Sequence, residues 1–190
     1  MKLIVGLGNP EEKYVATRHN LGWLTLDALG KKLPVSGWRL DKKSNALLAK
    51  GRDFVFVKPQ TYMNSSGLAV KSLVTSFSVL KLSDLWLIHD DVDLPLGKIK
   101  IVKKRGSAGH RGVDSVIQAL GSIDFVRFRL GVGYPHANRQ IGIRKKISRF
   151  VLAPFLPTEE DELRRMIKKT VKAVDLALIE GIDSAMNRYN

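Results

Sequence analysis

Two stretches decide the fold that the sequence predicts: residues 2–10, KLIVGLGNP, and residues 85–93, LWLIHDDVD. Each opens with an apolar run of strand length and then changes to glycine or polar residues, which is typical of a buried strand. Between them, apolar residues recur at roughly helical spacing over residues 21–33, so a helix follows the first strand. This alternation of strands and helices indicates an α/β fold.

The rest of the chain continues the alternation. Residues 51–53, Gly-Arg-Asp, separate two short runs at 46–49 and 54–58 and predict a hairpin. Further strands are expected at 98–103 and 126–132, and helices at 65–77, 112–120 and 158–180. We therefore expect one globular domain over residues 1–190, with a mixed, twisted β-sheet flanked by helices. The segment 134–148 is expected to be a long basic loop.

The charge of the chain is strongly positive and unevenly distributed. Lys and Arg number 32 against 18 Asp and Glu, a formal net charge of +14, and residues 98–149 hold 13 basic and two acidic side chains. Such a field attracts polyanions, above all nucleic acid. The absence of cysteine excludes disulfides and thiolate metal sites. Without a long apolar run, the chain is expected to be soluble and cytoplasmic, with no membrane contact.

Polar side chains gather at the carboxyl ends of the predicted strands, where open α/β sheets place their sites. Asn9 follows the first strand, Asn64 follows the strand at 54–58, and Asp90 ends the strand at 85–89, while His19 precedes the first helix. Asparagine amides suit the positioning of a carbonyl or a water. Residues 106–112, GSAGHRG, either hold a phosphate on backbone N–H groups or form a tight turn.

His19 is the best candidate for a general base. A neutral imidazole can take a proton from water near pH 7, and a neighbouring carboxylate can orient it and stabilise the imidazolium that forms. Asp90 is the favoured partner because it stands directly at the strand end, with Asp91 and Asp93 as competitors.

Other kinds of site have weaker support. Gly6 and Gly8 begin a dinucleotide-binding pattern, but Glu11 stands where its third glycine is required. There is no P-loop and no G-x-S-x-G elbow, although Ser65 or Ser66 stays open as a nucleophile. The histidines show no metal-binding spacing; they are at positions 19, 89, 110 and 136. We therefore expect no cofactor and no metal.

Several motifs together resemble the bacterial-type peptidyl-tRNA hydrolase family. They are VGLGNP at 5–10, TRHN at 17–20, KPQTYMNSSG at 58–67, HDDVDLPLG at 89–97, FRLGVG at 128–133 and RFVL at 149–152, with Tyr14 between the first two. The resemblance extends over residues 1–187. It implies a single α/β domain, normally monomeric and free of metal, that cuts the ester between a peptide and the 3′ end of tRNA.

The resemblance also implies roles for individual residues. His19 becomes the catalytic base and Asp90 its partner, while the remaining positions bind substrate or tRNA. Those are Asn9 and Asn64 for substrate and water, Tyr14 and Met63 for the peptide channel, His110 and Arg111 for the substrate-binding motif, and Lys103 with Arg129 for the tRNA 5′ phosphate.

This chain departs from the family pattern at three places. Arg111 replaces an asparagine associated with substrate binding, and Glu11 replaces a glycine. Residues 98–105 hold one residue more than the pattern, which leaves the phosphate-binding lysine open; Lys103 is favoured over Lys100 and Lys104. A non-catalytic RNA-binding protein is the alternative function, because the same fold resembles a plant organellar splicing cofactor.

Overall fold

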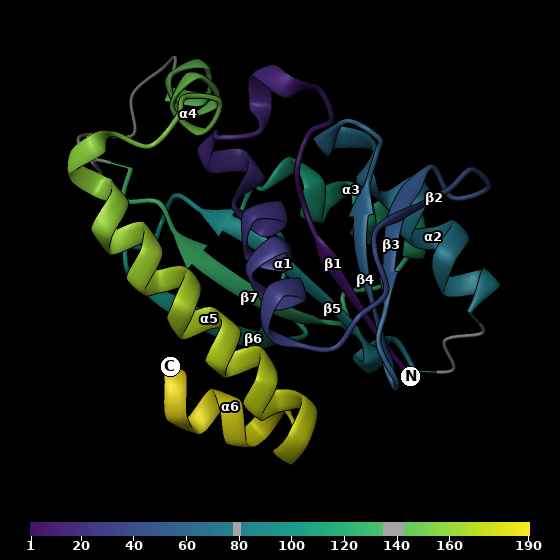
Figure 1. The fold of residues 1–190 in the computed structure, drawn as a ribbon. Coiled ribbons are helices and arrows are strands. Elements are labelled where there is room, and N and C mark those ends of the chain that lie inside the picture. Colours follow the sequence, from purple (N-terminus) through teal and green to yellow (C-terminus); the bar gives the residue numbers. More distant parts are fainter. Residues whose placement is uncertain (78–80, 135–142) are drawn as a thin grey trace.

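A mixed β-sheet runs through the middle of the molecule (Figure 1). The structure is a computed structural model and describes residues 1–77, 81–134 and 143–190. In these residues the sheet has seven strands in the order β2-β3-β4-β1-β5-β7-β6. They are β1 (Lys2–Gly6), β2 (Arg39–Asp41), β3 (Ala46–Lys50), β4 (Phe54–Pro59), β5 (Leu85–Asp91), β6 (Ile99–Lys103) and β7 (Val126–Gly131).

The four inner strands are parallel, and this brings the site residues together. β1 pairs in parallel with β4 and β5, and β5 with β7, whereas β2, β3 and β6 are joined antiparallel. Since Gly6 of β1 is in register with Ile88 of β5, the residues that follow β1 run beside the end of β5. The predicted mixed α/β fold is confirmed, and so is the hairpin of β3 and β4.

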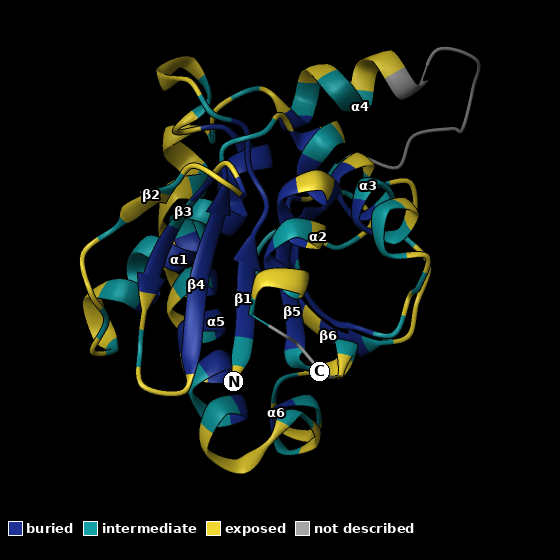
Figure 2. Ribbon diagram, turned by 90° about the vertical axis from the view of Figure 1, so that its right-hand side faces the viewer, coloured by how far each residue is buried: buried dark blue, intermediate teal, exposed yellow. Residues whose placement is uncertain are grey.

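Helices cover both faces of the sheet. One apolar layer joins it to α1 (Leu21–Lys32), α5 (Glu160–Glu180) and α6 (Ile182–Tyr189), and a second joins it to α2 (Ser66–Ser76) and α3 (Arg111–Leu120). Ile4 belongs to the first layer, while Leu3 and Val5 belong to the second. The inner strands are therefore buried on both sides, as Figure 2 shows. Among the described residues, no helix combines the length and apolar character that a membrane crossing requires.

Two glycines let α1 approach the sheet closely. A Cβ atom on Gly22 would lie 2.4 Å from the carbonyl oxygen of Ile88, and one on Gly6 would lie 2.5 Å from the carbonyl oxygen of Gly22. Real Cβ atoms do not come this close to backbone, so only glycine fits at either position. The contact sets the start of α1, and with it the preceding 3₁₀ turn η2 (Arg18–Asn20), against the end of β5.

The loop predicted over 134–148 is wrong for its last residues. Residues 143–148 belong to helix α4 (Ile143–Val151), and residues 135–142 lie outside the described residues. The sequence hides this helix because basic residues outnumber apolar ones over 143–148. The helix is amphipathic: Ile147 and Val151 face the site, while Lys145 and Arg149 are exposed. α4 lies near η2, beyond the end of the sheet (Figure 1).

Candidate active site

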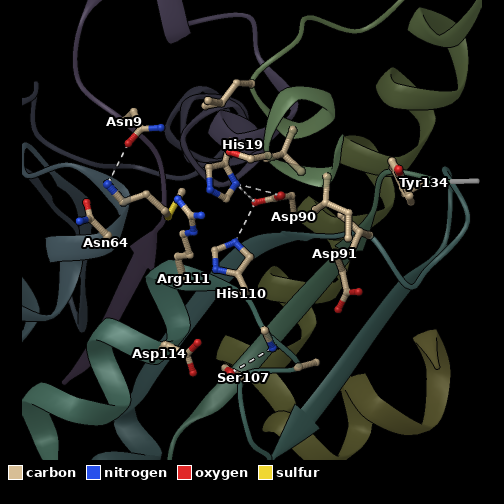
Figure 3. A pocket seen from close by; sticks show the side chains of 18 of the residues that line it. Asn9, His19, Asn64, Asp90, Asp91, Ser107, His110, Arg111, Asp114 and Tyr134 are labelled. Atoms are coloured by element: carbon tan, nitrogen blue, oxygen red, sulfur yellow. Dashed lines mark hydrogen bonds and ion pairs between the residues drawn. The ribbon is translucent and has the colours of Figure 1, made fainter. Parts of the chain in front are cut away.

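A cavity of about 840 Å³ opens at the carboxyl ends of the inner strands. Its wall includes most of the residues predicted to form the site: Asn9, Tyr14, His19, Met63, Asn64, Asp90, His110 and Arg111 (Figure 3). The volume is that of a typical small-molecule site. Lys103 and Arg129 are not among the residues of this wall.

His19 and Asp90 form a buried hydrogen-bonded pair. Nδ1 of His19 lies 3.0 Å from both carboxylate oxygens of Asp90, which is only 1% exposed. Burial alone raises the pKa of Asp90, but the electrostatic interactions and hydrogen bonds with His19 and His110 outweigh it and hold the pKa well below its usual value. Because an ionised carboxylate can only accept, Nδ1 of His19 carries the proton. Its Nε2 is therefore the basic nitrogen.

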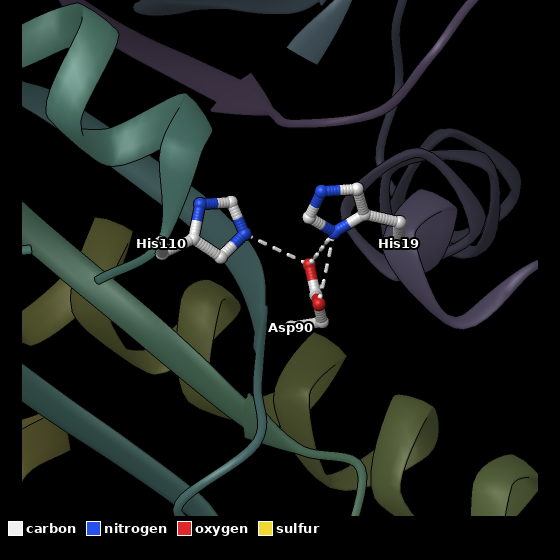
Figure 4. Close-up of side chains that lie close together, drawn as sticks. All are labelled: His19, Asp90 and His110. Atoms are coloured by element: carbon white, nitrogen blue, oxygen red, sulfur yellow. Dashed lines mark hydrogen bonds and ion pairs between the residues drawn. The ribbon is translucent and has the colours of Figure 1, made fainter. Parts of the chain in front are cut away.

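His110 is a second donor to the same carboxylate. Its Nε2 lies 2.9 Å from Oδ1 of Asp90, and its Nδ1 accepts the backbone N–H groups of Gly112 at 3.1 Å and Val113 at 3.3 Å (Figure 4). A backbone N–H can only donate, so Nδ1 of His110 is unprotonated and Nε2 donates to Asp90. The ring thus caps α3 and fixes the carboxylate at once.

The loop before α3 is a turn rather than an open phosphate cradle. Ala108 and Gly109 have positive φ angles of 54° and 82°. The N–H groups of Gly112 and Val113 are already bonded to His110. Of the two interpretations of residues 106–112, the tight turn fits this geometry.

The side-chain amide of Asn9 is oriented by its surroundings. Its Oδ1 accepts the backbone N–H of Met63 at 2.8 Å, while Asn20 bonds both its backbone N–H and its carbonyl. With the oxygen occupied, the Nδ2 donors are what Asn9 offers to the cavity. Asn64 is exposed in the same wall, in the 3₁₀ turn η3 (Met63–Ser65) that precedes α2.

The comparisons with known proteins agree with this site. The sequence profile described as "Peptidyl-tRNA hydrolase" matches residues 3–190. The chain belongs to the peptidyl-tRNA hydrolase family. Proteins named peptidyl-tRNA hydrolase from Thermodesulfovibrio yellowstonii and Desulforudis audaxviator are 40% and 42% identical, over 100% of this chain and 99% and 93% of theirs. A crystal structure of peptidyl-tRNA hydrolase from Acinetobacter baumannii matches with a TM-score of 0.89 and 28% identity, over 100% of this chain and 94% of that one.

The competing carboxylates of this family member have other contacts. Asp91 accepts from Nε of Arg129, on the neighbouring strand, and from the backbone N–H of Asp93. Asp93 is exposed at the cavity wall. Only Asp90, among the three, contacts His19 within the described residues.

Of the lysines considered for the phosphate contact, the structure places Lys100 rather than Lys103 beside Arg129. In the β6–β7 ladder Lys100 lies directly opposite Arg129, whereas Lys103 lies opposite Val126. Val126 and Arg129 are three residues apart, so they project from opposite faces of the strand. Lys103 instead pairs with Asp183 of α6. Sequence counting missed this because the face on which a side chain lies depends on register, and one residue of shift changes it.

His19, Asp90 and His110 also bring one ligand atom each within 4.8 Å of one another. Two imidazoles and a carboxylate are a common metal-ligand set. A metal at Nε2 of His110 would displace that proton, while Nδ1 is already occupied by two backbone donors. The three side chains are therefore better described as two imidazoles hydrogen-bonded to one carboxylate than as a metal centre.

Sequence reasoning missed two buried residues beside the site. Arg18 is 4% exposed, pairs with Glu159, bonds the carbonyl groups of Ala153 and Pro154, and lies 4.3 Å from the ring centre of Phe150. It ties the end of α4 to the turn that carries His19.

The second such residue is His89. It donates from Nδ1 to the carbonyl of Asp90 at 2.6 Å and packs edge-on against His110, with ring centres 4.6 Å apart. Neither role has a signal in the sequence beyond adjacency to the catalytic candidates.

Proposed function

We propose that this chain hydrolyses the ester between the peptide and the 3′ end of tRNA, with His19 as its general base. As a member of the peptidyl-tRNA hydrolase family, the chain is an ester hydrolase that acts on peptidyl-tRNA. The observation that supports the role of His19 is the hydrogen bond between its Nδ1 and buried Asp90, from which it follows that Nε2 is the basic nitrogen in the wall of the cavity.

The reaction follows from that arrangement. Nε2 of His19 takes a proton from a water molecule as the water oxygen attacks the ester carbonyl. Asp90 stabilises the imidazolium that results. When the carbon–oxygen bond to the ribose breaks, the 3′ oxygen leaves with the proton from Nε2, which yields free tRNA and a peptide carboxylic acid that then releases its proton to solvent. His19 is then neutral again.

The negative charge on the attacked carbonyl oxygen requires donors. Asn9 offers two N–H groups from Nδ2, because its oxygen is bonded to Met63. Such preorganised donors stabilise the tetrahedral intermediate more than the ground state. Asn64, in the same wall, positions the water or the carbonyl, and Tyr14 and Met63 contact the peptide.

The edge of the sheet at β6 and β7 supplies the tRNA contact in this proposal. Lys100 is exposed and lies opposite Arg129 in the ladder, so the two charges are a cross-strand pair. Phosphate contacts of this kind fix orientation without reading bases. We propose a single domain, since all seven described strands belong to one sheet. A cytoplasmic monomer is what the family membership implies, and we propose it on that ground.

Single-turnover cleavage of N-acetyl-aminoacyl-tRNA in the presence of a chelator tests the proposal. His19→Ala should lower the rate on the order of 10²–10⁴-fold, the usual range for a lost general base, while tRNA binding stays close to that of the wild type. A loss below tenfold would show that His19 is not the base. Wild-type protein that binds tRNA tightly but cleaves nothing would instead favour the RNA-binding alternative.

A further inference from the structure

A second hollow adjoins the catalytic cavity, between the start of α3 and helix α4. Its volume is about 530 Å³, and its lining consists of Arg111, Lys145, Lys146, Ser148, Arg149 and Leu152. Arg111, Ser148 and Leu152 also line the catalytic cavity. The two spaces therefore share a wall.

The described lining of the hollow is rich in positive charge and contains no carboxylate. Four of its six residues are cations. Other arginines near the site have a carboxylate beside them, since Arg18 pairs with Glu159 and Arg129 with Asp91. In the part of the chain that the structure describes, the four cations of the hollow take part in none of the ion pairs. Gathered cations repel one another, and an anion removes that repulsion.

The charges on α4 are held in place relative to His19. Arg18, next to His19, bonds the chain just after α4 at Ala153 and Pro154 and stacks on Phe150 within the helix. The backbone N–H of Arg18 also bonds the carbonyl of Ala153 at 3.1 Å. These contacts hold the hollow in a defined position relative to His19 at this end of α4.

We propose that this hollow binds the last phosphodiester of the tRNA, the one that joins its two 3′-terminal nucleotides. The inference rests on the proposed function, which places the scissile ester on the terminal ribose. That phosphodiester is the anion closest to the ester along the substrate, and the hollow is the cationic space that shares a wall with the cavity. Its lining has no aromatic residue on which a base could stack, whereas Arg111 and Arg149 offer forks that match phosphate oxygens.

In this proposal Arg111 adds a phosphate-binding group to the site. It stands at the first position of α3, lies between Asn64 and His110 in Figure 3, and lines both spaces. Its guanidinium can hold the phosphodiester while the terminal ribose and its ester enter the cavity.

The test uses two N-acetyl-aminoacyl-CCA trinucleotides, one with a natural last linkage and one with an uncharged methylphosphonate there. Lys146→Ala/Arg149→Ala removes two charges from the hollow without touching the catalytic cavity. Lys168→Ala/Lys172→Ala removes two charges from α5 and is the matched control. We expect the hollow variant to lower kcat/KM about tenfold with the natural linkage. With the methylphosphonate it should cause less than a twofold further loss, and the control pair should match the wild type on both substrates.

The outcomes separate the two proposals. Equal losses on both substrates, or an equal loss from the control pair, would overturn the phosphodiester site, because the cations would then act on the peptide or through overall charge. Dissociation constants of the two deacylated trinucleotides repeat the comparison without turnover. Suppose that neither the wild type nor any variant cleaves either ester, but the hollow variant still weakens binding of the natural trinucleotide more than binding of the methylphosphonate. The proposed function then fails, and the phosphodiester site stands.

Discussion

Replacing Asp90 with asparagine should disable the base by reversing its tautomer. Asp90 accepts two N–H groups, from Nδ1 of His19 at 3.0 Å and from Nε2 of His110 at 2.9 Å. In an asparagine of the same shape, the oxygen at the Oδ1 position can accept from both rings, and the NH₂ group takes the Oδ2 position, which lies 3.0 Å from Nδ1 of His19. His110 cannot present an acceptor at Nε2, because its Nδ1 already accepts from the backbone of α3.

The introduced NH₂ group lies beside His19 alone, so His19 is the ring whose tautomer the substitution can change. When its Nδ1 accepts from the NH₂ group of the introduced amide, its proton moves to Nε2, the nitrogen that has to take a proton from water. The wrong tautomer removes general-base catalysis, and the substitution also removes the carboxylate that stabilises the imidazolium. We expect kcat to fall on the order of 10³–10⁴-fold, at the upper end of the range for a lost general base.

The assay is single-turnover cleavage of N-acetyl-aminoacyl-tRNA over a range of pH. Asp93→Asn is the matched control, since Asp93 is exposed and does not contact His19; its loss should stay below about threefold. The residual rate of Asp90→Asn should rise with pH as hydroxide replaces the missing base. A loss below tenfold, or one equal to that of Asp93→Asn, would refute the tautomer argument.

Three further changes test the surroundings of the site. Burial, with the electrostatic effects of His110 and Arg127, holds the pKa of His89 well below 6.5. The unfolded chain therefore binds a proton first as pH falls. The free energy of unfolding should decline from about pH 6.5 to pH 5 by up to about 1.4 kcal/mol per pH unit, and His89→Phe should flatten this slope in urea titrations. Glu11 has φ 82° and ψ 140°, a backbone region suited to glycine. Glu11→Gly should therefore raise Tm by a few degrees, although it removes the hydrogen bond from Tyr62. An unchanged or lower Tm would count against backbone strain at this position. Gly22→Ala would place a Cβ 2.4 Å from the carbonyl oxygen of Ile88 and should destabilise the fold by about 1–3 kcal/mol and lower kcat; wild-type stability would contradict the close packing of α1.

The parts of the fold that the sequence predicts are those with a local cause. The apolar runs of β1 and β5 and the helical spacing of α1 each report burial directly, and the parallel arrangement follows from the helix between the strands. The meeting of His19 with Asp90 could be expected as well. Parallel strands end at one edge of a sheet, and both residues stand beside such ends.

The features of the fold and site that the sequence does not predict depend on contacts between distant residues. Whether Lys100 or Lys103 faces Arg129 is decided by the register of two strands, which neither strand encodes alone. The short edge strand β2 has no alternation of its own, and α4 is fixed by the buried side chain of Arg18. The helix-cap position of His110, directly before an apolar helical pattern, was a visible signal of its role.

One chain of hydrogen bonds explains why a change at position 111 in the cavity wall leaves the tautomer of His19 unchanged. The N–H groups at the start of α3 fix Nδ1 of His110, the opposite nitrogen donates to Asp90, and Asp90 holds the proton of His19 on Nδ1. Each link forces the next, because backbone amides only donate and carboxylates only accept. Arg111 contributes no side-chain atom to this chain, although it stands between its members. An arginine there can therefore change which substrate atoms are held without changing the tautomer of His19, so substitutions of Arg111 should move KM more than the pH dependence of kcat.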